Sequence, residues 1–395
     1  MITNPTAVFF VLAAVVAVAV ALEIRSKLFR ALGSALVGIL LGMLLSNTGV
    51  IPGESPAYDF LAGPAVSAGI ILILLTVDIR SVAKAGPKML AAFVVGGVGS
   101  ALGASAAALL LADAIGPETW KLAGQYSATY TGGGVNFAAV GAALETSGEL
   151  FAAGIAADVT MTAIWMAICL TVPILFAGSG EEDPDPHLEV AGDYATQSGV
   201  GEGLEGEPAP SLHKMLYSSV GSIELHDLAT MAALVLGTLW ISDWLAILFA
   251  PVPSVLFLTT ITLVLAQIPA VSGLRGTGVI GNYLVLVFLA SNGAMSVLAN
   301  IVVIGPPIVY FAALTVGIHG VVIFGVGRLV GLDLKTLAVA SQANVGGPAS
   351  AMALATARGY TDRLLPGVAV GLLGYAAGNY LGLGVAAVLR GMLGG

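Results

Sequence analysis

Charge is scarce in this sequence. Asp, Glu, Lys and Arg make up 9% of its 395 residues, whereas about a quarter is usual in soluble proteins. Apolar residues reach 57%, and the mean hydropathy is +0.98. Too few polar side chains remain to cover a fold in water, so the composition predicts an integral membrane protein.

Cysteine and basic residues are also few. A lone cysteine, Cys169, excludes an intrachain disulfide and gives no information about the redox compartment. Lys and Arg number 14 against 23 acids, and most of the net charge of −9 arises from acids within 178–224. The rest of the chain is nearly neutral, so we expect no nucleic-acid partner.

Clustered catalytic side chains are missing too. Of the four histidines, His187, His213 and His226 lie in or near the acidic stretch, and His319 stands among apolar residues. The sequence shows no paired membrane aspartates, no serine placed with histidine and no cluster of metal ligands. We therefore expect that the protein is not an enzyme and needs no organic cofactor.

Long apolar runs are abundant. A helix needs about 20 apolar residues to cross a lipid core about 30 Å thick, because its backbone polar groups must be paired within the segment. On this rule we predict spans at 7–22, 30–46, 60–78, 88–113, 150–176, 227–249, 253–270, 279–300, 305–328 and 363–389. The first run lacks a basic segment before it, so we interpret it as a span and not a signal peptide.

The spans fall into two halves. Residues 1–177 form an N-terminal repeat, 178–224 an acidic flexible loop, and 225–395 a C-terminal repeat. Each repeat holds about five spans and one stretch, 121–144 or 335–358, whose central glycines weaken a continuous helix by about 1 kcal/mol each. The second stretch also contains a proline. We predict an all-α polytopic fold of two inverted repeats, each with a glycine-tipped broken helix or re-entrant hairpin.

Similarity between the halves and the placement of basic turns support this topology. A shift of 213 positions aligns Gly133 and Gly134 with Gly346 and Gly347. If each broken stretch enters the membrane and returns, the halves are inverted and the main basic turns share one side, which is cytoplasmic by the positive-inside rule. This predicts a multi-pass protein of the cell (plasma) membrane, with both termini outside and 178–224 in the cytoplasm.

Two hairpins that meet tip to tip would enclose a polar cavity near the membrane midplane. Half-helix N-termini suit an anionic group there, unwound carbonyls suit a cation, and glycine lets the backbone approach a solute closely. We predict a solute site formed by Thr129, Tyr130, Thr131, Gly132, Gly133, Gly134, Asn136, Ser341, Gln342, Asn344, Gly346, Gly347 and Ser350. The alternative is that these polar groups only cap two broken helices.

Asp158 lies well inside the span 150–176, directly after the first broken stretch. A carboxylate at that depth costs at least about 2.5 kcal/mol unless it meets a cation, a proton or a partner. We predict that Asp158 binds the coupling ion, either sodium held together with hairpin carbonyls or a proton. The alternative is a structural hydrogen bond to a hairpin amide.

Thr162, Asn292 and Asn379 are further candidates for ion coupling. Asn379 lies on a span that the repeat relates to the span of Asp158. For Asn292, joining of helices is the favoured interpretation. His319 is interpreted as a satisfied core histidine, with a proton relay as the alternative.

The motifs YTGGGVNFAAV and NVGGPASA resemble those of a bacterial and plant membrane family known as domain of unknown function 819. The resemblance covers nearly the whole chain. More remotely, glycine-rich broken segments in inverted halves are similar to sodium/glutamate and 2-hydroxycarboxylate symporters, whose superfamily also contains bile-acid symporters and cation/proton antiporters. This likeness implies an elevator-like transport domain, a scaffold that forms a homodimer, and a sodium or proton gradient as driving force.

One departure from those symporters bears on the cargo. Dicarboxylate carriers of that kind supply an arginine to the substrate, whereas here no predicted span core contains Arg or Lys, and Arg358 and Arg363 are the nearest. We therefore expect a lipid-embedded symporter for a small polar solute such as an amino acid or monocarboxylate. A cation/proton antiporter is the alternative, and an ion channel is a weaker one.

Overall fold

Helices form wherever the sequence contains long apolar runs. The computed structural model describes residues 2–79, 82, 85–176, 223–250, 252–296 and 298–394, and these residues form helices and no strands. Eight helices among them are long and apolar enough to cross a membrane. The prediction of an all-α polytopic fold is confirmed.

The N-terminal half supplies most of its spans as single helices. They are α1 (Pro5–Arg25), α2 (Lys27–Asn47), the run α3 (Pro56–Phe60), η1 (Leu61–Ala65) and α4 (Val66–Leu74), α6 (Gly86–Ile115), α7 (Thr119–Gly132), α8 (Gly134–Ala143) and α9 (Gly148–Phe176). Pro64 lies inside η1 and removes a backbone donor, which accounts for the wider π-turn there. Gly33, at φ +74°, interrupts α2 and leaves a shorter apolar helix, Gly33–Asn47.

The C-terminal half also consists of helices. It contains α11 (Leu225–Leu248), α12 (Ser254–Ala266), the short α13 (Pro269–Ser272), α14 (Thr277–Ala294), α15 (Leu298–Leu329), α16 (Leu334–Ala357) and α17 (Thr361–Leu393). The predicted boundary of the span 279–300 is wrong, because α14 ends at Ala294 and 298–300 belongs to α15. A tight turn in which Ser296 N donates to Gly293 O separates the two helices. An apolar pattern alone does not reveal such a turn.

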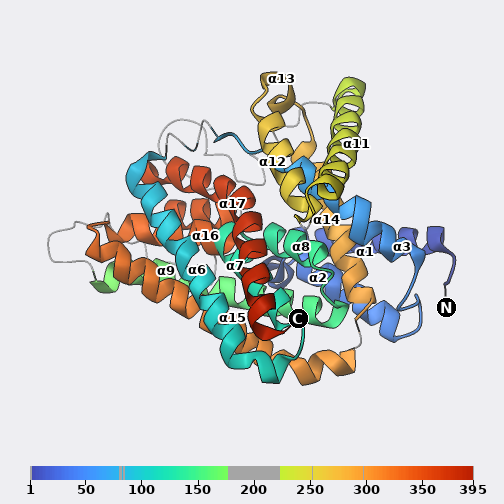
Figure 1. Ribbon diagram of the computed structural model, residues 1–395, viewed down its shortest axis with the longest axis horizontal. Coiled ribbons are helices and arrows are strands. Elements are labelled where there is room, and N and C mark those ends of the chain that lie inside the picture. The colour runs from blue at the N-terminus through green and yellow to red at the C-terminus, as the bar shows by residue number, and fades with distance from the viewer. Residues whose placement is uncertain are drawn as a thin grey trace.

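The helices form two groups, which Figure 1 shows on its left and right. The hairpin bundle consists of α6, α7, α8, α9, α15, α16 and α17, with α6 packed along α15. The companion bundle consists of α1, α2, α3–α4, α11, α12 and α14, with α14 packed between α2 and α4. Packing between the bundles is sparse compared with packing inside each of them.

Contacts between the two halves are reciprocal. α4 and α14 cross at Gly69 and Gly281: a Cβ on Gly69 would lie 2.9 Å from Gly281 O, and one on Gly281 would lie 2.8 Å from Gly69 O. The amide of Asn47 donates to Ser296 O at 2.8 Å, and the amide of Gln267 donates to Val77 O at 3.0 Å. The end of the third span in each half is therefore hydrogen-bonded by a side chain from the other half.

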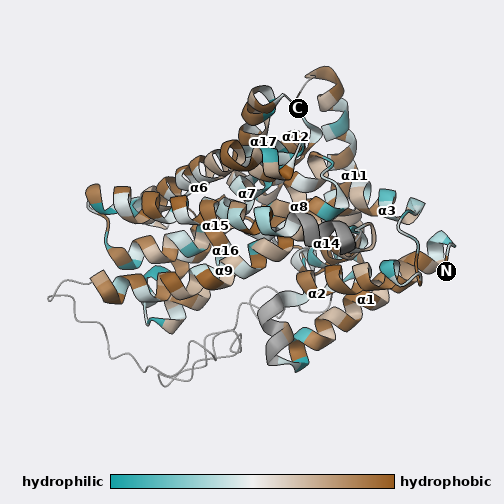
Figure 2. Cartoon of the chain, turned by 90° about the horizontal axis from the view of Figure 1, so that it is seen from below, coloured by the Kyte–Doolittle hydropathy of each residue, from teal (hydrophilic) through white to brown (hydrophobic). Residues whose placement is uncertain are grey.

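The outer surface is apolar. Figure 2 shows hydrophobic residues along much of α1 and α6. Large apolar side chains such as Phe10, Leu110, Trp240 and Ile247 are between 71% and 81% exposed. A surface of this kind suits lipid rather than water. The acidic loop predicted at 178–224 lies, apart from its last two residues, outside the described part of the chain, and the proposed domain boundaries stay predictions.

Candidate functional site

The first broken stretch enters the hairpin bundle and returns to the same end. Its break is at Gly133 (φ +87°, ψ 176°), between α7 and α8. At its base Ser147 N donates to Glu118 Oε2 at 3.1 Å, and Lys121 Nζ donates to Glu145 O at 2.8 Å. Because the start of α7 and the end of α8 lie together, this segment, hairpin 1, is re-entrant.

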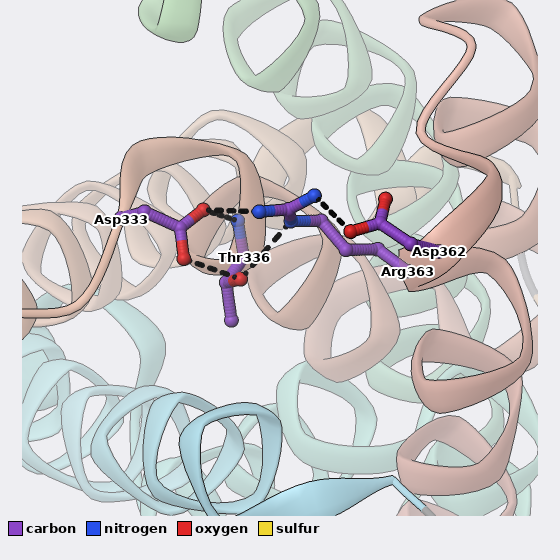
Figure 3. A network of polar contacts seen from close by, with 4 residues as sticks. All are labelled: Asp333, Thr336, Asp362 and Arg363. Carbon is purple, nitrogen blue, oxygen red and sulfur yellow. Dashed lines mark hydrogen bonds and ion pairs between the residues drawn. The ribbon is translucent and has the colours of Figure 1, made fainter.

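The second broken stretch has the same design. α16 breaks at Gly347 (φ +73°, ψ −167°). Figure 3 shows its base, where Arg363 Nη2 lies 3.1 Å from Asp333 Oδ1 and Arg363 Nε donates to Thr336 Oγ1. Asp333 also caps α16, since it accepts a hydrogen bond from Thr336 N at 2.8 Å. This segment, hairpin 2, is therefore re-entrant as well.

The two hairpins enter from opposite ends of α17. Arg363 in its first turn contacts the base of hairpin 2, whereas Arg390 in its last turn lies over the ring of Trp120 at the base of hairpin 1, 5.1 Å from the ring centroid. α17 has 33 residues and is therefore about 50 Å long. This length exceeds the lipid core of about 30 Å, so the bases lie at opposite ends of the bundle.

The tips meet backbone to backbone. A Cβ on Gly133 would lie 3.3 Å from Gly347 N, and a Cβ on Gly347 would lie 3.3 Å from Gly132 O. A Cβ on Gly132 would come within 2.1 Å of Gly374 O on α17. The positive φ values and these approaches together require glycine at the tips.

Asp158 lies beside the tip of hairpin 1. Its carboxylate is buried and accepts a hydrogen bond from Thr129 Oγ1, which is 3.4 Å from each oxygen. A Cβ on Gly134, the first residue of α8, would lie 3.9 Å from Asp158 Oδ2. The carboxylate therefore faces a half-helix N-terminus, and no Lys or Arg of the described residues forms an ion pair with it.

Several predicted solute-binding groups are buried without a hydrogen-bond partner. They are Tyr130 Oη, Asn136 Oδ1, Asn344 Oδ1 and both amide atoms of Gln342. The orientation of Asn136 is fixed, because its Nδ2 donates to Tyr375 O at 2.7 Å and to Asn379 Oδ1 at 2.9 Å. Buried polar groups are usually paired in folded proteins. These atoms lack a hydrogen-bond partner in this structure, which the interpretation as helix caps does not explain.

Other predicted solute-site residues either have hydrogen-bond partners within the protein or lie at the partly exposed edge of the tips. Thr131 Oγ1 donates to Ser127 O of its own helix, and Ser341 Oγ contacts both His319 and Trp165. Gly346 and Ser350 lie together at the tip of hairpin 2, where both are partly exposed. The neighbouring Ala349 is exposed, as is Gly134 in hairpin 1, so the meeting point of the tips is open on part of its surface.

The ion-coupling candidates do not all gather at Asp158. Thr162 lies one helical turn beyond Asp158 on α9 and is partly exposed. Asn379 is buried and donates to Thr259 Oγ1 of α12 at 3.3 Å, which links the hairpin bundle to the companion bundle. Asn292 donates to Phe288 O in its own helix and lies near Gly148. Gly148 begins α9, about 15 Å along the helix from Asp158.

The basic residues nearest to the tips in the sequence are bound elsewhere. Arg358 Nη2 donates to Leu170 O, and Arg363 belongs to the ion pairs at the base of hairpin 2. Both ring nitrogens of His319 are hydrogen-bonded, to Gly96 O and Ser341 Oγ, as expected for a core histidine. Sequence reasoning missed Ser100, Trp165 and Thr259 as partners of the site. Ser100 stands in a run of small residues that indicates only close packing.

The base of hairpin 2 makes folding stability depend on pH. Burial would raise the pKa of Asp333, but hydrogen bonds from the Thr336 amide and hydroxyl and the charge of Arg363 outweigh it and lower that pKa. A lowered pKa in the folded state gives stability that is present above the unfolded value of about 3.9. It is lost as pH falls through the folded pKa.

We expect Asp333→Asn to lower the free energy of unfolding by about 1 kcal/mol at pH 7, because Asn keeps the cap but loses the ion pair. The difference from the unmodified protein should begin to shrink as pH falls below about 4 and should vanish below the lowered pKa of Asp333 in the folded protein. Thermal unfolding across this pH range measures it. Asp362→Asn is the control, since Asp362 also contacts Arg363 but its side chain is 70% exposed. An equal effect of both substitutions would contradict the assignment.

Comparison with known proteins agrees with the fold. A family model described as "Protein of unknown function (DUF819)" matches residues 8–392. The "Uncharacterized membrane protein YjcL" of Bacillus subtilis (strain 168) is 32% identical over 348 residues, which covers 86% of this chain and 85% of that protein. Together with the apolar helices, this relative supports an integral multi-pass membrane protein.

Proposed function

We propose that this chain, which belongs to the DUF819 family of membrane proteins, is a secondary active transporter for a small polar organic solute. One observation carries the proposal: two re-entrant hairpins enter from opposite ends of α17 and meet at glycine tips beside the buried Asp158. Non-helical backbone at membrane depth persists where it is buried in protein or lines a cavity. Such a site between two halves is typical of transporters.

The chemistry at the tips favours a neutral, zwitterionic or singly negative solute. Asn136 Oδ1 and Asn344 Oδ1 offer acceptors, and Gln342 offers both a donor and an acceptor. The N-termini of α8 and of the second part of α16 favour a carboxylate. Arg358 and Arg363 are bound away from the tips, so neither of these guanidinium groups balances a second negative charge on the solute. An amino acid or a monocarboxylate meets these requirements.

Sodium or a proton is the proposed coupling ion at Asp158. A buried carboxylate whose hydrogen-bond partner is a hydroxyl at 3.4 Å leaves lone pairs without donors. A sodium ion would be held by this carboxylate, by Thr129 Oγ1 and by carbonyls freed at the break. A proton bound to the Asp158 carboxylate would instead neutralise its negative charge. Symport is the proposed direction of coupling, because ion binding would order the tip that faces the solute.

The proposed mechanism is alternating access of the elevator type. The hairpin bundle would move against the companion bundle, which is consistent with the sparse packing between them. The hydrogen bonds from Asn379 to Thr259 and between Thr260 and Tyr380 cross that boundary and would break during the movement. The reciprocal contacts of the two halves support inverted repeats. By likeness to the remote symporters, the companion bundle would form a homodimer.

The proposed orientation in the plasma membrane follows from the basic turns, which place the base of hairpin 2 in the cytoplasm and the base of hairpin 1 outside. Ser147 and Thr361 are exposed at the two bases. A cysteine at Ser147 should react with an impermeant reagent added outside intact cells, and one at Thr361 should not. The reverse pattern would overturn the orientation.

Cation/proton antiport is the alternative function. It needs a second acid or a buried lysine near Asp158. The 213-residue shift places Gly371 opposite Asp158, whereas the structural breaks at Gly133 and Gly347 differ by 214 positions and place Leu372 there. Neither position carries an acid or a lysine, which favours symport.

Solute uptake by purified protein in liposomes tests the proposal. Radiolabelled amino acids and monocarboxylates are supplied under an imposed sodium gradient, a proton gradient or neither. We expect accumulation of one solute class under one gradient and none in protein-free vesicles. If exchange of sodium for protons occurs while no solute accumulates, antiport replaces symport. If neither process occurs, the transporter assignment fails.

A further inference from the structure

A buried chain of hydrogen bonds connects the two hairpins away from their tips. His319 on α15 lies at its centre, with Nδ1 2.9 Å from Gly96 O and 3.0 Å from Ser100 Oγ, both on α6. Its Nε2 lies 2.8 Å from Ser341 Oγ on hairpin 2. Trp165 Nε1 on α9 donates to the same Ser341 oxygen at 2.9 Å. All four side chains are buried.

The partners fix the direction of the bonds that His319 makes, whereas the Ser100 hydroxyl has two acceptors within reach, Tyr130 O and Gly96 O at 3.1 Å. Gly96 O is an acceptor only, so the proton of a neutral His319 ring must be on Nδ1. Nε2 is then an acceptor, and the Ser341 hydroxyl donates to it while accepting from Trp165. Ser100 in turn donates its proton to Tyr130 O. A single neutral tautomer therefore satisfies the whole chain, so a change at one end alters the partners at the other.

The chain begins at the ion site. Tyr130 leaves helical geometry, with φ −83° and ψ 18°, because hairpin 1 unwinds there. The donor that an intact helix would give to Tyr130 O is Gly134 N, which instead begins α8. Ser100 supplies the missing donor. Tyr130 directly follows Thr129, whose hydroxyl contacts Asp158, so the position of this carbonyl depends on how Thr129 is held.

The chain ends at the solute side. Ser341 directly precedes Gln342, whose amide is buried without a partner. The helices around the chain are brought close by glycines: a Cβ on Gly99 would lie 3.1 Å from His319 Cα, and a Cβ on Gly320 would lie 2.1 Å from Trp165 Cη2. His319 and Trp165 therefore pack directly against the neighbouring helices, so a shift of His319 would press on Trp165.

We propose that Ser100 and His319 are positioning residues that couple the two hairpins, so that an ion at Asp158 and Thr129 sets the geometry of hairpin 2 through Tyr130 O, Ser100, His319 and Ser341. The inference rests on the proposed ion site at Asp158. It adds a route by which ion binding organises the solute site, and it assigns His319 to positioning rather than proton transfer.

Trp165 serves as the reporter in the test. The chain has four tryptophans, and replacing Trp120, Trp240 and Trp244 by Phe leaves Trp165, which is hydrogen-bonded to Ser341. In a first series, NaCl replaces choline chloride at constant ionic strength in the solution of this parent protein. In a second series, the pH is varied without sodium. Emission of Trp165 and the melting temperature are both recorded. We expect a saturable change in both with one of the two ions.

Ser100→Ala in this parent should keep the ion-dependent rise in melting temperature, with an ion affinity weaker by about three- to tenfold. The ion-dependent change in Trp165 emission should fall in this variant to less than about a quarter of the change in the parent protein. His319→Asn, which keeps a donor near the position of Nδ1, should lose the response as well, because the contact with Ser341 is gone. Ser105→Ala is the matched control, a serine on the same helix outside the chain.

Two outcomes would overturn the inference in different ways. An unchanged Trp165 response in Ser100→Ala and His319→Asn would show that ion binding reaches α9 without this chain, while the ion site itself stands. Absence of any response of the parent to both sodium and protons would remove the ion site and the coupling together. If His319→Asn does not fold, Ser100→Ala decides the question, with Ser105→Ala as its control.

Discussion

Asp158→Asn is expected to reduce solute uptake by at least about a hundredfold and to abolish stabilisation of the protein by its coupling ion. The amide cannot carry a negative charge, so it neither attracts sodium nor takes up a proton. A loss of roughly 3 kcal/mol in ion binding corresponds to this factor. Uptake in liposomes and melting temperature with and without the ion measure the two effects.

The same substitution separates the functional role from a structural one. The hydroxyl of Thr129 is 3.4 Å from each carboxylate oxygen, which is long for a hydrogen bond to a charged group. Without ion, Asp158→Asn should therefore leave the melting temperature unchanged or raise it, because burying an amide costs less than burying a lone carboxylate. A structural hydrogen bond predicts destabilisation instead. Asp243→Asn, at an exposed acid on α11, is the matched control.

Gly133→Ala and Gly347→Ala are expected to have the second large effect. Both glycines adopt positive φ with ψ near 180°, a region that side chains essentially exclude, at a cost of about 1–3 kcal/mol each. Each added methyl group would also press against the opposite tip at 3.3 Å. We expect lower melting temperatures and more than about tenfold slower uptake, because the tips must separate.

Gly317→Ala on α15 is the control for these two substitutions. Nothing lies within 4 Å of a Cβ at Gly317, and its backbone is helical. Alanine there should raise stability by about 0.5–1 kcal/mol and leave uptake unchanged. If Gly133→Ala and Gly347→Ala behave like this control, the tips are not closely packed and the proposed site loses its geometric basis.

Apolar length and glycine placement were sufficient to predict much of the fold. The helices coincide with the predicted runs because lipid forces the backbone to pair within each segment. Gly133 and Gly347 mark both breaks, because clustered glycines, followed by a proline in the second stretch, weaken a continuous helix. The boundary at 279–300 failed because the turn after Ala294 contains small and apolar residues without a charge or proline.

Side-chain roles were less predictable. Thr129 and Asp158 are brought together, and Asn136, Gln342 and Asn344 have free buried atoms, whereas Thr131 and Ser341 belong to local or structural contacts. Asn292 is distant from Asp158 although both are polar and lie in spans. Helix periodicity indicates which residues share a face, but it does not indicate which helix lies opposite.

The sequence by itself determined the lipid environment, the helices and the two glycine breaks, because each depends on local composition and backbone chemistry. Only the tertiary structure decided that the breaks are re-entrant, through the contacts of Glu118 with Ser147 and of Asp333 with Arg363. It also decided that Ser100, His319 and Ser341 join the hairpins. These partners are far apart in the chain, and their meeting depends on how whole helices pack rather than on any local pattern.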